Sequence, residues 1–223
     1  MLKAALLDLD GTLIDTPQAI VEVAQATMGE LGRPPVSEVV MRNGIGLPLP
    51  VALAEAMGIP VEHPEVERAR QIYSRVWRAT VSPRLHALLF PGVLDALGEL
   101  RRANLRLGVV TGKAQEGADL TVDGAGLRPF MEVVLGYNAV KNPKPAPDLA
   151  LEALRQMDVA PRHAVVVGDS SLDILMAKAA AVRSIAVSCG AQPARTLQAA
   201  SPDWLVPAFS DAARILLDLC KEP

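Results

Sequence analysis

The segment from Ala4 to Leu13 constrains the fold most, because an apolar run there leads directly into two aspartates one residue apart. The run 4–7 predicts a short buried strand, and Gly11 allows a sharp turn after it. Side chains alternate along a strand, so Asp8 and Asp10 would point to the same side. Chemistry in an open α/β sheet lies just beyond the carboxyl ends of strands, and buried carboxylates are costly without a cation or a reaction that uses them. Although Asp10-Gly11 alone would indicate an ordinary turn, we expect both aspartates to face one site.

Composition narrows the classes of function. Half of the 223 residues are hydrophobic, which is enough for a large core, and 22 basic residues nearly balance 25 acidic ones. Only 3% of the residues are aromatic, which argues against single-stranded nucleic acid as a partner. Cys189 and Cys220 are too few for a disulfide framework or a zinc cluster. The chain shows no signal peptide and no apolar run long enough to cross a membrane, so we expect a cytoplasmic protein, as a monomer or homodimer.

The segment 15–88 predicts helices and no strand. Thr16 is the expected N-cap and Pro17 the first residue of a helix that runs to Leu31. Further helices are predicted at 36–43, 49–57 and 64–80. In the last of these, Val66, Ala69, Tyr73, Val76 and Trp77 mark one apolar face, so Trp77 is expected in a helical core. We therefore predict an inserted, all-helical domain over residues 15–88.

After residue 88 the pattern changes to strands that alternate with helices. Strands are expected at 105–110, 131–135, 163–167, 184–188 and 203–206, and helices at 93–102, 147–157, 171–181 and 210–220. Such alternation is typical of a mostly parallel sheet that is covered on both faces. The predicted fold is α/β, with a catalytic core formed by residues 1–14 and 89–223.

Two further segments carry groups suited to phosphate. Thr111 and Gly112 follow the strand at 105–110 and offer a hydroxyl and an uncrowded backbone N–H, although an ordinary turn is an alternative interpretation. The spacing around Gly112 does not fit a P-loop, which needs one more residue and a Ser or Thr after the lysine. A proline-rich loop then holds Lys141 and Lys144. One of these lysines would neutralise a phosphate or the carboxylates, and solvent exposure of both is the alternative.

A third strand end carries carboxylates again. Asp169 follows the apolar strand at 163–167, and Asp173 lies in the first turn of the next helix. Acidic residues favour helix N-termini for structural reasons, and this alternative explains Asp173 better than Asp169. The repetition of a buried strand followed by carboxylates predicts that both strand ends contribute to one site.

Together these segments resemble the four motifs of the haloacid dehalogenase superfamily. The matching residues are 8–12 (Asp-x-Asp-x-Thr), Thr111, Lys144, and Asp169 with Asp173. Lys-Pro-x-Pro from Lys144 and Gly-Asp-Ser-x-x-Asp from Gly168 are similar to the phosphoglycolate phosphatase branch. The resemblance implies a Rossmann-like parallel sheet with a helical cap. The chain departs from the family at Gly112, where many relatives have Asn, and at Ala181, where glycine is usual.

The resemblance also implies a mechanism for hydrolysis of a small phosphorylated metabolite. Mg²⁺ would be the cofactor, because it prefers oxygen ligands and shields phosphate charge. Asp8 would attack phosphorus to form an aspartyl-phosphate, and Asp10 would act as general acid and then base. The remaining roles fall to phosphate-binding Thr111, Gly112 and Lys144, and to the metal ligands Asp8, Asp10 (through its backbone carbonyl), Asp169 and Asp173.

Substrate choice stays open at this stage. Phosphoglycolate is the family-level expectation, and Arg42 is the candidate that would bind a substrate carboxylate, unless it is an exposed arginine at a helix end. Asp10 argues for a phosphatase or mutase, because an alcohol leaving group needs an acid. A sugar phosphomutase and a non-catalytic member that only binds a phosphorylated ligand are the alternatives.

Overall fold

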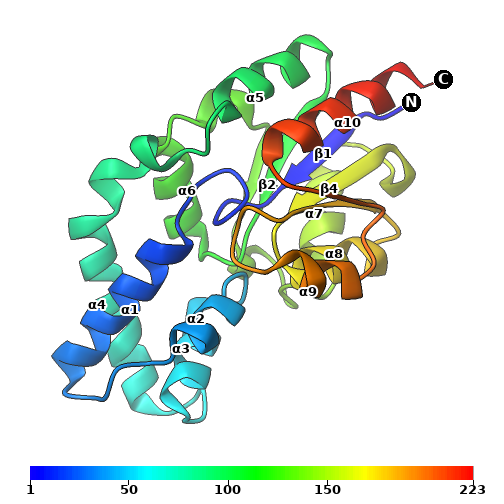
Figure 1. Ribbon diagram of the computed structural model, residues 1–223. Coiled ribbons are helices and arrows are strands. Elements are labelled where there is room, and N and C mark those ends of the chain that lie inside the picture. Colours follow the sequence, from blue (N-terminus) through cyan, green and yellow to red (C-terminus); the bar gives the residue numbers. More distant parts are fainter. Residues whose placement is uncertain (223) are drawn as a thin grey trace.

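The computed structural model describes residues 1–222, in which six parallel strands form one sheet (Figure 1). The strand order is β3-β2-β1-β4-β5-β6, so β1 lies in the centre and pairs with both β2 and β4. The strands are β1 (Ala4–Leu7), β2 (Arg106–Val110), β3 (Val133–Leu135), β4 (Ala164–Gly168), β5 (Arg183–Val187) and β6 (Trp204–Val206). The predicted α/β fold with a parallel sheet is confirmed.

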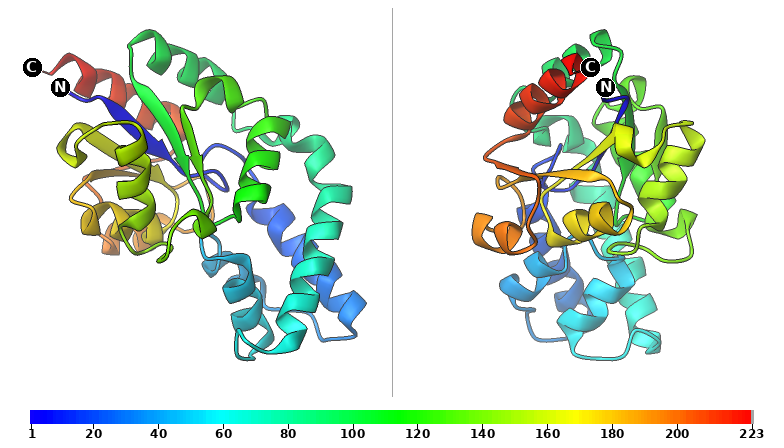
Figure 2. Two further views of the ribbon diagram at one scale, coloured as in Figure 1. Left: turned by 180° about the vertical axis from the view of Figure 1, so that it is seen from behind. Right: turned by 90° about the vertical axis from the view of Figure 1, so that its right-hand side faces the viewer.

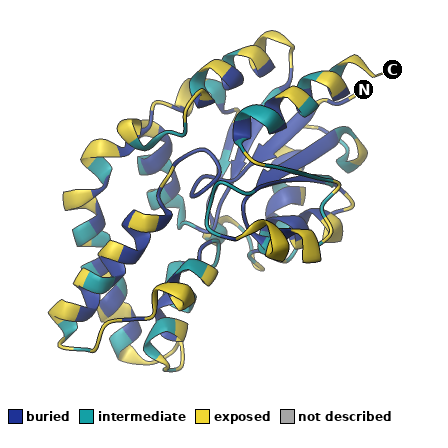
Figure 3. Cartoon of the chain, in the orientation of Figure 1, coloured by how far each residue is buried: buried dark blue, intermediate teal, exposed yellow. Residues whose placement is uncertain are grey.

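Helices cover both faces of the sheet, because the strands are apolar on both sides. Along β1, Ala5 and Leu7 belong to one apolar core, whereas Ala4 and Leu6 belong to the other. The first core is completed by α5 (Val93–Arg102) and α10 (Phe209–Lys221), and the second by α7 (Asp148–Gln156) and α8 (Ser171–Ala179). Most residues of the strands are therefore buried (Figure 3), and the carboxyl ends of the parallel strands lie at one edge of the sheet.

The elements between β1 and α5 are all helices. They are α1 (Pro17–Leu31), α2 (Glu38–Asn43), α3 (Leu49–Met57), α4 (Pro64–Thr80) and the 3₁₀ helix η1 (Ser82–Leu88). Helix α4 packs against α1, α3 and η1, and the group projects away from the sheet (Figure 2). Tyr73 and Trp77 lie on the buried face of α4, as the helical spacing predicts.

Two chain crossings connect this helical segment to the sheet, and they lie side by side. The backbone N–H of Asp15 donates to the carbonyl of Leu88 at 2.7 Å, and that of Phe90 donates to Leu13 at 3.1 Å. Because hydrogen bonds tie the crossings together, the start and the end of the helical segment are held at one place near the end of β1.

The predicted elements are present, with ends that differ by one or two residues. The remaining elements are α6 (Gln115–Gly124), α9 (Ala194–Ala199) and three short 3₁₀ helices: η2 (Arg128–Phe130), η3 (Tyr137–Ala139) and η4 (Pro161–His163). Thr16 is the N-cap residue of α1 and Pro17 its first residue, as predicted, but the Thr16 side chain makes no capping hydrogen bond. Its hydroxyl donates to Asp10 instead. Within residues 1–222, no helix is both long and apolar enough to span a membrane.

Candidate active site

The ends of three neighbouring strands bring the predicted site residues together. Asp8 follows β1, Thr111 follows β2 and Asp169 follows β4, and these strands are adjacent in the sheet. All three residues are buried, with 1–3% of their surface exposed. The left-handed conformation of Gly11 (φ +81°) turns the chain directly after Asp10, a geometry that glycine adopts without steric cost.

Lys144 links two of the carboxylates. Its Nζ atom lies 2.8 Å from Oδ1 of Asp8 and also forms an ion pair with Oδ1 of Asp173. Burial disfavours the charged lysine, but the negative charges of Asp173 and Asp8 outweigh it and raise the pKa of Lys144. The lysine therefore stays cationic at the point where the carboxylates converge.

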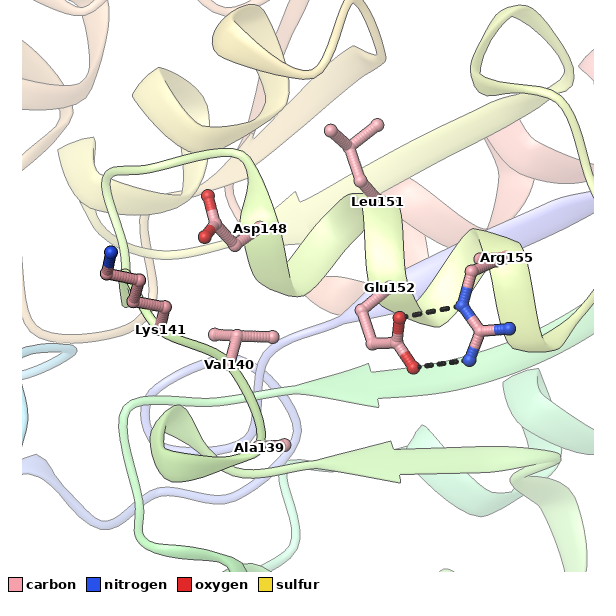
Figure 4. A pocket seen from close by; sticks show the side chains of 7 residues that line it. All are labelled: Ala139, Val140, Lys141, Asp148, Leu151, Glu152 and Arg155. Atoms are coloured by element: carbon pink, nitrogen blue, oxygen red, sulfur yellow. Dashed lines mark hydrogen bonds and ion pairs between the residues drawn. The ribbon is translucent and has the colours of Figure 1, made fainter.

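Lys141 lies elsewhere, although it belongs to the same proline-rich loop. It lines an open surface pocket of about 380 Å³ together with Asp148 and Glu152 (Figure 4). Glu152 is paired there with Arg155. The two lysines that the sequence left as alternatives are thus separated by the structure: Lys144 is buried with the carboxylates, and Lys141 is exposed.

Asp169 is held by hydrogen bonds and by close backbone contacts. The Thr12 hydroxyl donates to its Oδ1 at 3.1 Å, and the Ala191 N–H donates to its Oδ2 at 2.6 Å. A Cβ atom at Gly11 or Gly190 would lie 2.1 Å from Oδ2, so both positions need glycine for this carboxylate to fit. The carboxylate therefore has one fixed orientation.

Asp173 has a structural role in addition to its contact with Lys144. It forms a capping box with Ser170 at the start of α8: the Asp173 N–H donates to the Ser170 hydroxyl at 3.4 Å, and the Ser170 N–H donates to Oδ2 of Asp173 at 3.2 Å. The Ser170 hydroxyl also donates to the same Oδ2 at 2.6 Å. A Cβ atom at Gly168 would lie 2.2 Å from Cγ of Asp173, so only glycine leaves room for this side chain. The helix-terminus interpretation of Asp173 is confirmed. Its role as a site residue stays a prediction, which its contact with Lys144 supports.

Asp8, Asp169 and Asp173 form one acidic group, in which a carboxylate oxygen of each lies within 4.8 Å of those of the others. Burial raises the pKa of Asp8 to about 7, against the lowering effect of Lys144. Burial, with the nearby charge of Asp8, also raises the pKa of Asp169. Three carboxylates face one ammonium group, and a bound cation would offset the remaining charge.

The Asp10 side chain is separate from this acidic group. Its Oδ1 accepts a hydrogen bond from the Thr16 hydroxyl at 2.6 Å, and its Oδ2 lies 2.9 Å from Nζ of Lys113. That Nζ lies 4.2 Å from the centre of the Trp77 ring. Sequence reasoning did not assign a role to Lys113. Its place directly after Thr111 and Gly112, at a strand end, was the available signal.

Gly112 touches the helical segment. A Cβ atom there would lie 2.2 Å from the carbonyl oxygen of Gly46, in the loop between α2 and α3. Glycine at this position therefore has a steric cause in this chain, because the Gly46 backbone occupies the space of a side chain. Thr111 is buried beside it, and its Oγ1 accepts a long hydrogen bond of 3.3 Å from the Lys113 N–H.

Arg42 lies on α2 and contacts neither aspartate of the first motif. Its guanidinium donates to Glu38 at 2.8 Å and to Gln18 at 2.7 Å. The side chain is 30% exposed. Its predicted role in binding a substrate carboxylate stays a prediction, and these contacts would have to open for it.

Comparisons with known proteins agree over nearly the whole chain. Residues 5–187 match the model of the family described as haloacid dehalogenase-like hydrolase. “Probable phosphatase IndB” of Dickeya dadantii is 36% identical and aligns with 100% of this chain and 98% of its own. “Phosphoglycolate phosphatase” of Pseudomonas putida is 28% identical and aligns with 99% of this chain and 80% of its own. The crystal structure of a “predicted phosphoglycolate phosphatase” from Haemophilus somnus covers 96% of this chain and 97% of its own, with a TM-score of 0.84. At 21% identity this similarity shows the fold alone.

Proposed function

Since the chain belongs to the haloacid dehalogenase-like hydrolase family, we propose that it hydrolyses phosphate monoesters of small metabolites, with Asp8 as the attacking group. Relatives that align over most of the chain are named phosphatases, which supports a phosphoric monoester hydrolase. The observation that carries the proposal is the buried contact of Lys144 with Asp8 beside Asp169 and Asp173. Such a concentration of charge at strand ends is expensive for a merely structural role.

Asp8 and Asp10 divide the chemistry between them. An oxygen of Asp8 forms a bond to phosphorus while the bond from phosphorus to the alcohol oxygen breaks. Asp10 gives a proton to that alcohol oxygen and later takes one from the water that hydrolyses the aspartyl-phosphate. The separate position of the Asp10 carboxylate, outside the acidic group, suits this division.

The phosphoryl oxygens would be bound by the Thr111 hydroxyl, the Gly112 backbone N–H and the Lys144 ammonium. Fixed donors aimed at these oxygens stabilise the charge that shifts onto them in the transition state. Thr111 and Lys144 are both buried, with 1% and 2% of their surface exposed, so water would compete little for these bonds.

The acidic group fits Mg²⁺, which prefers carboxylate and carbonyl oxygens and keeps several waters. Asp8 and Asp169 would hold the ion, with the Asp10 backbone carbonyl, and Asp173 would support them. When bound, the ion would supply positive charge that weakens the repulsion between the phosphate and the attacking carboxylate. The fit is supported by the spacing of the three carboxylates and by the charge that Lys144 leaves unbalanced.

The substrate would be small, and phosphoglycolate is the candidate. We assign residues 15–88 to a cap domain and residues 1–14 and 89–223 to the catalytic core. The contact of Gly46 with Gly112 supports a cap that covers the phosphate-binding strand end and limits water there. The phosphoglycolate phosphatase among the relatives supports the choice of substrate.

Phosphate release from a panel of esters tests the function. The panel contains phosphoglycolate, sugar phosphates and nucleoside monophosphates, each with Mg²⁺ and with a chelator. We expect release by the wild-type enzyme that is lost with the chelator and in Asp8→Asn. The ranking of kcat/KM values then identifies the class of substrate.

The same panel separates the alternatives. Conversion of a sugar phosphate to its positional isomer, without phosphate release, would show a mutase. Thermal stabilisation by an ester without any turnover would show a non-catalytic binding protein. Either result would overturn the proposed hydrolysis.

A further inference from the structure

The carboxylate of Asp10 is fixed from two sides. Thr16 occupies one oxygen, and the ammonium of Lys113 lies 2.9 Å from the other. The Lys113 side chain is 16% exposed and the Asp10 side chain 11%, so their interaction is weakly screened by solvent. The direction in which Asp10 presents its oxygens therefore depends on where Lys113 is held.

Lys113 is in turn held by α4. Its ammonium lies 4.2 Å from the centre of the Trp77 ring, within the range of a cation–π interaction. The Trp77 ring stacks on Tyr73 one turn earlier, with ring centres 6.0 Å apart and planes at 14°. Both rings are buried in the helical segment, so the face that Lys113 contacts is itself rigid.

We propose that Lys113 is a positioning residue: its contact with Asp10 orients that carboxylate toward the leaving-group oxygen, and Trp77 holds Lys113 in place. Lys113 thereby makes proton transfer in the core depend on the placement of α4 over it. The inference rests on the proposed function, in which Asp10 donates a proton as the bond from phosphorus to the alcohol oxygen breaks. No contact between Lys113 and the substrate is needed for this role.

The leaving group provides a test that a merely structural role would not pass. An ester with a poor leaving group needs the proton in the transition state, whereas the para-nitrophenolate anion departs with little help. The parameter kcat/KM covers the steps up to release of the alcohol and excludes hydrolysis of the aspartyl-phosphate. The ratio of kcat/KM for para-nitrophenyl phosphate to that for phenyl phosphate therefore reports on proton donation alone.

We expect this ratio to rise about tenfold or more in Lys113→Met. It should rise further in Asp10→Asn, because that variant lacks the proton donor itself. Trp77→Leu should raise it less, and Lys113→Arg should restore part of the loss for phenyl phosphate. The matched control is Trp204→Leu, because Trp204 also carries a cation over its ring, Arg183 at 5.6 Å, but on the edge strand β6. The ratio should be unchanged there.

Equal losses for both esters in Lys113→Met, with a normal circular dichroism spectrum, would overturn the proposal. A ratio unchanged in both Lys113→Met and Trp77→Leu would do the same. Failure of the proposed function would look different, because the wild type would then hydrolyse neither ester in an Asp8-dependent way. In that case the contact itself can be tested by fluorescence, because Trp204→Phe leaves Trp77 as the sole tryptophan. If Lys113→Met in that background does not alter the fluorescence emission of Trp77, the contact between Lys113 and Trp77 is overturned.

Discussion

The ammonium of Lys144 and the carboxylate of Asp8 are in contact at 2.8 Å, although 136 residues separate them in the sequence. Both are almost fully buried, and Asp173 shares the same ammonium. Removal of one partner from a buried ion pair leaves an uncompensated charge, which costs far more than the loss of a surface pair. The contact therefore matters for stability as well as for chemistry.

Lys144→Met should lower the free energy of unfolding of the metal-free protein by about 3–5 kcal/mol, because two buried carboxylates lose their counter-charge. Phosphate release with Mg²⁺ should fall by about 10²–10³-fold, since a donor to the phosphoryl oxygens is lost. Urea unfolding and phosphate release measure the two effects. Lys141→Met, in the same loop but exposed, is the control and should behave as wild type. Equal behaviour of the two variants would contradict the role of Lys144.

The contribution of Asp8 to the stability of the metal-free protein should fall as the pH rises from about 4 to 7. Burial raises its pKa from an ordinary 3.8 to about 7, so the folded state binds more protons than the unfolded chain in this range. Urea unfolding at several pH values, with a chelator present, measures the effect as the difference between wild type and Asp8→Asn. As the pH rises, the free energy of unfolding of the wild type should decrease relative to that of Asp8→Asn. A difference that moves the other way would show that the folded state favours the ionised carboxylate.

Mg²⁺ should raise the melting temperature of the wild type and much less that of Asp169→Asn. The ion would offset the charge that Lys144 leaves unbalanced, and Asp169 is one of the carboxylates proposed to hold it. Differential scanning fluorimetry over a Mg²⁺ titration gives the shift without any substrate. Asp203→Asn tests specificity, because Asp203 accepts hydrogen bonds from Ser184 near the other end of β5. Identical titrations of the Asp169 variant and the wild type would rule out Asp169 as a ligand.

Gly112→Ala should destabilise the protein by about 1–3 kcal/mol, as is typical of overpacking. The added methyl group would overlap the Gly46 carbonyl at 2.2 Å, so the loop between α2 and α3 has to move. The kcat/KM for the best ester should fall with it. Gly117→Ala, within helix α6, is the matched control. A Cβ atom at Gly117 would meet only Cβ of Lys113, at 3.9 Å. The control should gain about 0.5–1 kcal/mol. A tolerated Gly112→Ala would show that the two segments are not in contact.

Ala181→Gly should stabilise the protein by about 1 kcal/mol, because alanine in the left-handed region carries a steric cost that glycine avoids. Ala181 has φ +55° and follows Ala180, the C-cap residue of α8. Thermal unfolding compares it with Ala26→Gly, an exposed alanine in the middle of α1, which should lose about 0.5–1 kcal/mol. Destabilisation by both substitutions would contradict the backbone conformation at Ala181.

The sheet was predictable because its strands are short apolar runs that alternate with helical segments, and several of them end in polar residues. Strands β1 and β4 have this pattern most clearly, and Asp8 and Asp169 follow them. Lys144 was predictable only through its resemblance to a family motif, since proline-rich loops commonly expose their lysines. The structure adds that its ammonium is buried between two aspartates.

The contacts between the helical segment and the sheet could not be predicted. Lys113, Trp77 and Asp10 belong to three distant segments, and periodicity assigns Trp77 only to a buried face. Thr16 is a similar case: it is the N-cap residue, as predicted, but its hydroxyl donates to Asp10 and not to the helix. Tertiary partners decide such cases, and local sequence does not contain them.

Trapping of the phosphorylated enzyme tests the central claim most directly. Wild-type protein is mixed with a radiolabelled ester that it hydrolyses and Mg²⁺, quenched in acid within milliseconds, and digested for mass spectrometry. We expect phosphate on the peptide that contains Asp8, at a level that decays as inorganic phosphate is released. No label should remain in Asp8→Asn. Phosphate release by the wild type with no covalent label at any quench time, or a label that persists in Asp8→Asn, would contradict attack by Asp8.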